Sequence, residues 1–206
     1  MAEFWNNTSI KYNQRNRIIE RFLTDLRSSK QVNFSLESCN VCAAACAIES
    51  VGGNWKLKLP SIDGNAIFSQ ADLMFNYIYS YPKGLPVLDN GNGVCENECI
   101  ENLAFAVKKL SNCKAECYYN GNNADLVDDI IEQLLNNNAA IVTSYKDDIT
   151  TGHYICIVKY DTDAENFVYY DSWKENPRNK NNGSLESISK NELINCIKHR
   201  YMSVYL

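Results

Sequence analysis

The chain has 206 residues, 45% hydrophobic and 22% charged, a size and composition that can bury a core without cross-links. Its 20 basic and 25 acidic residues give a net charge of -5, and no cluster of Lys and Arg stands out along the sequence. We therefore expect a single domain over 1–206 and no nucleic-acid-binding surface.

The sequence shows no signal for a membrane or for export. No apolar run approaches the roughly 20 residues of a spanning helix, and the N-terminal MAEFWNNTSIKYNQRNR lacks the apolar centre of a signal peptide. A cytoplasmic protein is expected, or a secreted one if the sequence is a processed fragment. The nine cysteines cannot all pair with one another, so free thiols or a metal site come before disulfides.

Two segments near the N-terminus have the apolar spacing of helices. Residues 14–28 place apolar side chains on one stripe with charges opposite, which predicts an amphipathic first helix. Residues 39–51 repeat apolar side chains at i, i+3, i+4 and i+7, with Ser38 in position to cap the helix and Gly52 and Gly53 in position to end it. This second segment carries three thiols, those of Cys39, Cys42 and Cys46.

The middle of the chain is less regular. Residues 52–95 are rich in Gly, Asn, Pro and Ser, which indicates a loop-rich insertion with one helix at 69–80. Residues 97–110 and 124–136 return to helical periodicity, the second after an Asn-rich turn suited to capping. Two further helices are predicted there.

After residue 138 the chain changes to short runs of β-branched and aromatic residues, which are typical of strands. The connection at 161–166 has the length of a hairpin loop, so antiparallel pairing is expected. Residues 174–184 are predicted to form an exposed loop and 189–199 a last helix. The predicted strands are AAIVTSY (139–145), HYICIVKY (153–160), FVYYDSW (167–173) and MSVYL (202–206).

Helices followed by an antiparallel sheet give an α+β fold, and no repeat of 20 to 50 residues is present. We expect a mostly helical lobe over 1–136, including the insertion at 52–95, packed on a sheet lobe over 137–206. A cleft between the two lobes is the expected place for a site.

One histidine and one aspartate are placed for chemistry. His153 opens a predicted strand after a Thr-Thr-Gly turn, whereas His199 follows Lys198 at the end of the last predicted helix and is interpreted as a solvated or helix-terminal residue. Asp171 interrupts an apolar strand, where an unpartnered carboxylate would be costly. On the strand beside His153 it could accept the imidazole N–H and fix the tautomer; the alternative is a strand-end Asp forming a turn.

The three thiols differ in their position on the helix. Cys39 stands at the N-terminus, where unpaired N–H groups and the helix dipole favour the thiolate. Cys42 and Cys46 lie one and two turns further along and are expected to be core residues. A thiol at a helix start, a histidine about 114 residues later and an aspartate on the next strand suit thiol acyl transfer.

The sequence resembles the papain-like cysteine peptidases, in particular the branch similar to bacteriocin-processing peptidases that cut after double-glycine leaders. The segment CNVCAAACAIESVGG resembles that branch's C-(G/N)-x-(T/S)-(S/A)-x-x-M-x-L pattern, and GHYICIVKYD and YYDSW resemble its later histidine and aspartate segments. The resemblance covers residues 31–206. It implies a papain-like fold, Cys39 as nucleophile, His153 as general base and acid, Asp171 as orienter, a peptide or protein substrate and no cofactor.

The chain departs from that pattern at three places. The family commonly uses a Gln about six residues before the nucleophile as an oxyanion-hole donor, where this chain has Asn33, with Gln31 as the rival donor. Ser172 replaces the usual Pro after the aspartate, and Lys159 replaces a Gly. Neither of these last two changes removes a reacting group.

The remaining thiols allow other readings. Cys95, Cys99, Cys113 and Cys117 form two C-x3-C pairs that could bind a structural zinc ion or form two disulfides. The three thiols of the 39–51 helix could instead bind a metal together with His153, although adjacent turns of one helix splay poorly around a tetrahedral ion.

The sequence thus predicts a thiol hydrolase, most simply a cysteine peptidase acting through an acyl-enzyme thioester. The alternatives are a binding module on the same fold that lacks turnover, and a thiol acyltransferase or deamidase that uses the same groups. The sequence leaves substrate and oligomeric state open.

Overall fold

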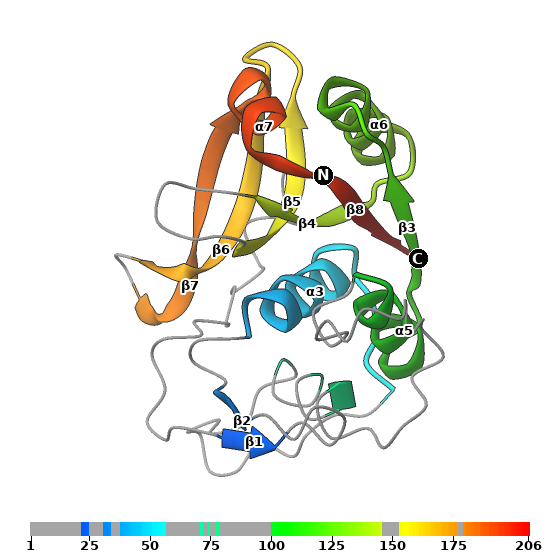
Figure 1. Ribbon diagram of the computed structural model, residues 1–206, viewed down its shortest axis with the longest axis vertical. Coiled ribbons are helices and arrows are strands. Elements are labelled where there is room, and N and C mark those ends of the chain that lie inside the picture. Colours follow the sequence, from blue (N-terminus) through cyan, green and yellow to red (C-terminus); the bar gives the residue numbers. More distant parts are fainter. Residues whose placement is uncertain are drawn as a thin grey trace.

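The computed structural model describes residues 22–24, 31–33, 38–56, 71, 74, 77, 78, 100–145, 153–176 and 179–206. Its main feature is a six-stranded antiparallel sheet with the order β3-β8-β4-β5-β6-β7 (Figure 1). The strands are β3 (Lys114–Tyr119), β4 (Ala140–Tyr145), β5 (His153–Asp161), β6 (Asn166–Asn176), β7 (Asn179–Ser189) and β8 (Ile197–Tyr205).

Helices cover both faces of the sheet and enclose two hydrophobic cores. Helices α3 (Cys39–Ser50) and α5 (Ile100–Leu110) pack against one face, and α6 (Asn123–Asn136) and α7 (Lys190–Cys196) contribute to the core on the other. Because side chains alternate along a strand, β5 serves both cores. Tyr154, Cys156 and Val158 belong to the α3 side, and Ile155 and Ile157 to the α6 side.

Helix α3 lies beside α5 on the same face of the sheet and is buried almost all round, with contacts to β4, β5, β6 and β8 (Figure 1). Its small residues explain this position: the run from Ala43 to Ala45 is almost fully buried and lets the helix lie close to its neighbours. A helix that is apolar on every side is typical of a core element. Its first residue therefore has a fixed position relative to the sheet.

Most predicted elements are confirmed. The segments predicted as helices at 39–51, 97–110 and 124–136 are α3, α5 and α6, and the described residues of 69–80 are helical. The four predicted strands are β4, β5, β6 and β8, and β5 pairs antiparallel with β6 across the turn that begins at Asp161. The α+β prediction is thus correct.

Three predictions of local structure are wrong. Phe22–Thr24 form strand β1, paired antiparallel with β2 (Gln31–Asn33), where a helix over 14–28 was expected; the rest of that segment lies outside the described residues. In the expected loop at 174–184, residues 174–176 belong to β6 and residues 179–184 to β7, because the two backbones pair there. The last helix ends at Cys196, so His199 lies on β8 with a φ of 42° instead of at a helix end.

Strand β3 was also not predicted from the sequence. Residues 114–119 form β3, which pairs with β8 at the edge of the sheet. The sheet therefore takes a strand from before residue 137. Two of its six residues are charged, Lys114 and Glu116, which weakens the strand signal. Its cysteine indicated a metal site or a disulfide instead, so the alternation of exposed and buried positions at its start was not recognised.

The end of α3 is a complete Schellman motif. The N–H of Gly53 donates to the carbonyl of Ile48 at 2.8 Å, and the N–H of Gly52 donates to the carbonyl of Glu49 at 3.1 Å. Gly52 has a φ of 75°, the left-handed conformation that this motif requires. The predicted Gly-Gly helix stop is confirmed.

Gly53 is also packed too closely to accept a side chain. A Cβ atom at this position would lie 2.3 Å from Cys113 Sγ and 2.8 Å from the Ile48 carbonyl oxygen. We expect Gly53→Ala to lower the free energy of unfolding by about 1–3 kcal/mol, the usual cost of overpacking. Gly121→Ala is the matched control, because a Cβ there meets nothing within 4 Å. Urea unfolding of both variants checks this, and equal stability would contradict the packing.

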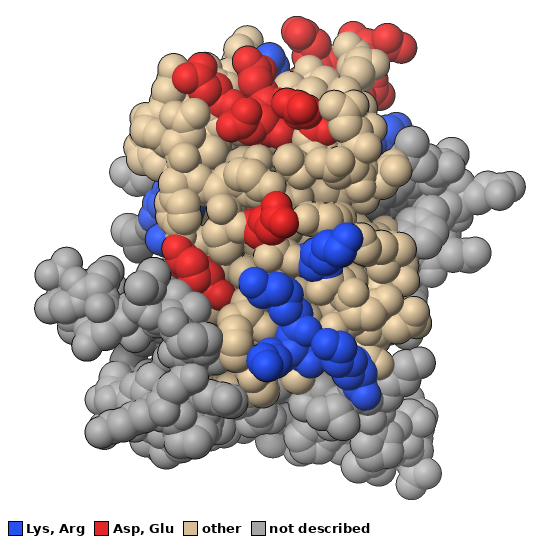
Figure 2. Space-filling view, turned by 90° about the vertical axis from the view of Figure 1, so that its right-hand side faces the viewer, with Lys and Arg blue, Asp and Glu red and all other residues tan. Residues whose placement is uncertain are grey.

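Charge is unevenly distributed on one face of the molecule. Figure 2 shows carboxylates gathered toward the end formed by α6 and lysines over the half formed by α5. The Lys56 ammonium donates to the Lys108 carbonyl at 2.8 Å, and Lys109 lies 5.4 Å from the ring centre of Phe105. Both lysines therefore support the C-terminal turn of α5.

None of the helices in the described part of the chain is long and apolar enough to cross a membrane.

Candidate active site

The thiol of Cys39 stands at the N-terminus of α3. Cys39 is the first helical residue and is partly buried, while Cys42 and Cys46 are buried inside the core on the α3 side. The N–H groups of the first helical turn lack intrahelical acceptors and carry a partial positive charge. The predicted difference between Cys39 and the other two thiols is confirmed for their burial.

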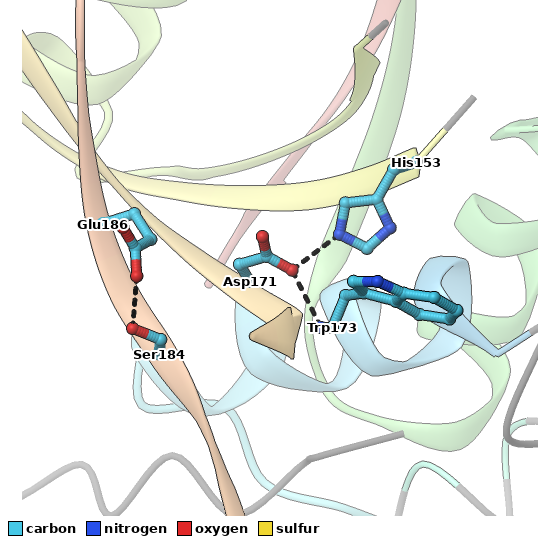
Figure 3. Close-up of polar contacts among 5 residues, drawn as sticks. All are labelled: His153, Asp171, Trp173, Ser184 and Glu186. Carbon is cyan, nitrogen blue, oxygen red and sulfur yellow. Dashed lines mark hydrogen bonds and ion pairs between the residues drawn. The ribbon is translucent and has the colours of Figure 1, made fainter. Parts of the chain in front are cut away.

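His153 and Asp171 are in direct contact. His153 Nε2 lies 2.7 Å from Asp171 Oδ1, and the two side chains are 6% and 2% exposed (Figure 3). His153 begins β5 beside Tyr145, the last residue of β4, and Asp171 lies on the adjacent β6. The sequence prediction that Asp171 lies on the strand next to His153 and bonds its imidazole is thus confirmed.

A bulge in β6 holds the carboxylate in place. Asp171 pairs with Ser184 on β7, but the next pair is Glu175 with Gly183, so the segment between them leaves the ladder. Within it the backbone N–H of Trp173 turns back and donates to Asp171 Oδ1 at 2.8 Å. Asp171 Oδ1 thus accepts from both Trp173 and His153. Bulges of this kind often redirect side chains next to functional sites.

The same bulge brings the Trp173 side chain to the histidine. The indole and imidazole rings meet edge-on, with centres 6.4 Å apart, and Figure 3 shows the indole lying beside His153. No role for Trp173 was predicted from the sequence. The sequence shows only that an aromatic residue stands two positions after Asp171. The bulge in β6 explains how this residue and the Asp171 carboxylate reach the same histidine.

The environment of His153 favours its protonated form. Burial lowers the pKa of His153, but hydrogen bonds from its ring to Asp171 and Cys39, together with their negative charge, outweigh burial and raise the pKa to about 9. Because Asp171 occupies Nε2, the nitrogen that remains for Cys39 is Nδ1. A thiol, an imidazole and a carboxylate therefore form one continuous set across α3, β5 and β6.

The other predicted site residues are placed only in part. Asn33 and Gln31 are the two ends of strand β2, and their side chains lie outside what the structure describes. His199 is exposed on β8 and is not among the groups that shift the pKa of His153. Ser172 is buried in the β6 bulge, so the replacement of the family's Pro keeps a small residue there.

The cysteines outside the site are thiols where the structure describes them. Cys113 is buried before β3, and burial raises its pKa; Cys117 is partly buried on the same strand. Cys95 and Cys99 lie outside the described residues, so the four-cysteine arrangement stays a prediction. Within the described ranges, no three His, Cys, Asp or Glu side chains are grouped as metal ligands. Cys39, Cys42 and Cys46 with His153 therefore do not form such a group.

The fold and this set of side chains define a class. A thiol at a helix start, bonded to an imidazole that a buried acceptor orients, is the arrangement used by papain-like cysteine peptidases. A family comparison agrees: the chain belongs to the Peptidase_C39 like family, whose model matches residues 12–196. The prediction of a papain-like cysteine peptidase is confirmed at this level.

The chain was also compared with solved structures and with curated proteins. The crystal structure of the Pseudomonas avirulence protein AvrPphB matches with a TM-score of 0.42 and 10% identity, over 92% of this chain and 97% of that chain. No protein of curated function matches the sequence.

Proposed function

We propose that the protein hydrolyses peptide or amide bonds with Cys39 as nucleophile, His153 as general base and acid, and Asp171 as the group that orients His153. The observation that carries the proposal is the 2.7 Å hydrogen bond between the buried side chains of His153 and Asp171. The Cys39 side chain is hydrogen-bonded to the same imidazole ring. A peptide or protein is the proposed substrate.

The proposed reaction follows from this arrangement. His153 takes the Cys39 proton and becomes an imidazolium that Asp171 stabilises, and the thiolate attacks the carbonyl carbon of the scissile bond. The imidazolium then gives its proton to the leaving amine. Water, activated by His153, attacks the thioester and releases the acid product, which restores the thiol.

The oxyanion that forms during both attacks needs hydrogen-bond donors. The backbone N–H of Cys39 is one candidate, because it belongs to the first turn of α3 and has no acceptor within the helix. We propose Asn33 as the second donor, through its side-chain amide, with Gln31 as the alternative. Removal of one such donor typically lowers the rate by about a hundredfold or more.

Selective alkylation tests the proposal without knowledge of the substrate. We expect iodoacetamide to label Cys39 before the buried thiols, because Cys39 is partly exposed at the start of α3 and its sulfur lies beside His153, which can take its proton. Peptide mapping by mass spectrometry after brief labelling locates the modified residue. Cys156, whose pKa burial raises well above its ordinary value, is the internal control that should stay unlabelled.

Uniform slow labelling of all thiols would contradict the proposal and favour a binding module without turnover. Transfer of the acyl group to an added amine in place of water would favour the acyltransferase alternative. A separate portion of the protein that has not been alkylated, incubated with a mixed-sequence peptide library, separates these outcomes by the products formed.

A further inference from the structure

The start of α3 is capped in an unusual way. At the start of a helix, four N–H groups have no intrahelical acceptor: those of the residue just before the helix and of the first three helical residues. The side chain of the residue just before the helix commonly accepts from one of them. In α3 that residue is Ser38, and its side chain makes no capping bond. Its hydroxyl lies 3.7 Å from Cys42 Sγ instead. The predicted N-cap position of Ser38 is confirmed, but its side chain does not cap the helix.

Asn40 does the capping from inside the first turn. Its Oδ1 accepts from the backbone N–H of Val41 at 2.7 Å. The carbonyl of Ser38 accepts from the N–H of Cys42 at 2.9 Å, which is the first regular bond of the helix. The Asn40 side chain thus accepts from the N–H of Val41, the third helical residue. The N–H groups of Cys39 and Asn40 then form the open end of the helix.

The surroundings of Asn40 indicate that this bond matters. Asn40 is 1% exposed, and its Nδ2 is buried with no hydrogen-bond partner among the described residues. An unpaired buried amide is costly, and an apolar side chain would avoid that cost. What an apolar residue could not supply is the acceptor for Val41.

We infer that Asn40 is a positioning residue for the proposed nucleophile: it fixes the first turn of α3 and thereby the thiol and the backbone N–H of Cys39. The inference rests on the proposed function, in which that N–H faces the oxyanion. Asn40 is too buried to touch a substrate, so it acts through the backbone. The groups that face Cys39 from the sheet, His153 and through it Asp171, are already fixed by the β6 bulge.

Three variants test the inference. Asn40→Ala removes the acceptor, Asn40→Asp keeps an acceptor oxygen in the same place, and Ser38→Ala alters the formal cap position that makes no capping bond. We expect Asn40→Ala to speed hydrogen exchange of the Val41 amide by about tenfold, the usual effect of a lost cap. Asn40→Asp and Ser38→Ala should leave that exchange close to wild type.

Turnover of a peptide found in the library screen gives the second readout. We expect Asn40→Ala to lower kcat by about ten- to a hundredfold with little change in KM, because the misplaced donor serves only the developing oxyanion. Asn40→Asp should recover most of kcat, because its carboxylate oxygen can still accept from the Val41 N–H. A merely structural role would lower stability without this split between kcat and KM.

Three results would overturn the inference. The first two are unchanged Val41 exchange in Asn40→Ala, and lost protection of Val41 with an unchanged kcat. The third is an equal loss of kcat in Asn40→Ala and Asn40→Asp, because the amide group and not the cap would then be required. Failure of the proposed function looks different, since the wild-type protein itself would then show neither turnover nor selective labelling of Cys39.

Discussion

Replacement of Cys39 by Ala is expected to abolish peptide hydrolysis, with a loss of about a millionfold if the protein behaves as other enzymes do on loss of their nucleophile. No other group at the start of α3 can form the thioester. The fold should survive, because Cys39 is only partly buried and Ala is a good helix former. Turnover of a mixed-sequence peptide library, followed by mass spectrometry, measures the loss, and circular dichroism confirms the fold.

Cys42→Ala is the matched control for this prediction. Cys42 is fully buried one turn further along the same helix, and its Sγ contacts Ser38 Oγ at 3.7 Å. We expect its replacement to cost about 1 kcal/mol or less in stability and to leave turnover within a few-fold of wild type, because Ala fills most of its volume. Intact hydrolysis in Cys39→Ala together with its loss in Cys42→Ala would show that the wrong thiol has been assigned.

The sequence predicted those elements whose own periodicity matches their burial. Strand β5 and helix α6 both carry clear patterns, and the cap of α6 is as expected: Asn122 Oδ1 accepts from the Ala124 N–H at 2.9 Å. Strand β7 could not be recognised, because its Asn, Lys and Gly residues have low strand propensity. Pairing with β6 overrides that propensity. Such pairing depends on distant residues, which no local pattern contains.

The candidate site was predictable to a similar extent. The order of Cys39, His153 and Asp171 along the chain was enough to predict that they meet, since each opens or interrupts a recognisable element. The contributions of Trp173 and Asn40 were not predictable, because each acts through a backbone hydrogen bond. The Trp173 N–H reaches Asp171 only through the β6 bulge, and Asn40 caps α3 only because the side chain of Ser38 does not.

Replacement of Asp171 is expected to have the second largest effect. Asp171→Ala removes the acceptor of both His153 Nε2 and the Trp173 N–H inside a buried site, so His153 loses its orientation. We expect kcat to fall by on the order of 10³–10⁴, as in other triads that lose the orienting group. Asp171→Asn keeps an oxygen that can accept from the same two donors, and we expect it to retain much more activity.

The pH dependence separates the two roles of the carboxylate. Because the pKa of His153 is raised to about 9, the imidazolium of the wild-type protein persists at neutral pH, and activity should decline as pH rises through about 9. Asp171→Asn orients the ring but lacks the negative charge, so the decline should move to lower pH, toward the ordinary value of 6.5. An alkaline limb that stays at the same pH in this variant would show that Asp171 does not raise the pKa.

The pH dependence of stability checks the raised pKa of His153 independently and needs no substrate. A histidine with a raised pKa binds its proton more tightly when folded, so its contribution is complete below pH 6.5 and is lost as pH rises through about 9. For His153 that contribution is about 3 kcal/mol. We expect urea unfolding of the wild type to show this decline between pH 6.5 and 9, and Asp171→Asn to lose most of it. Equal slopes in the two proteins would mean that the charge of Asp171 does not hold the proton on His153.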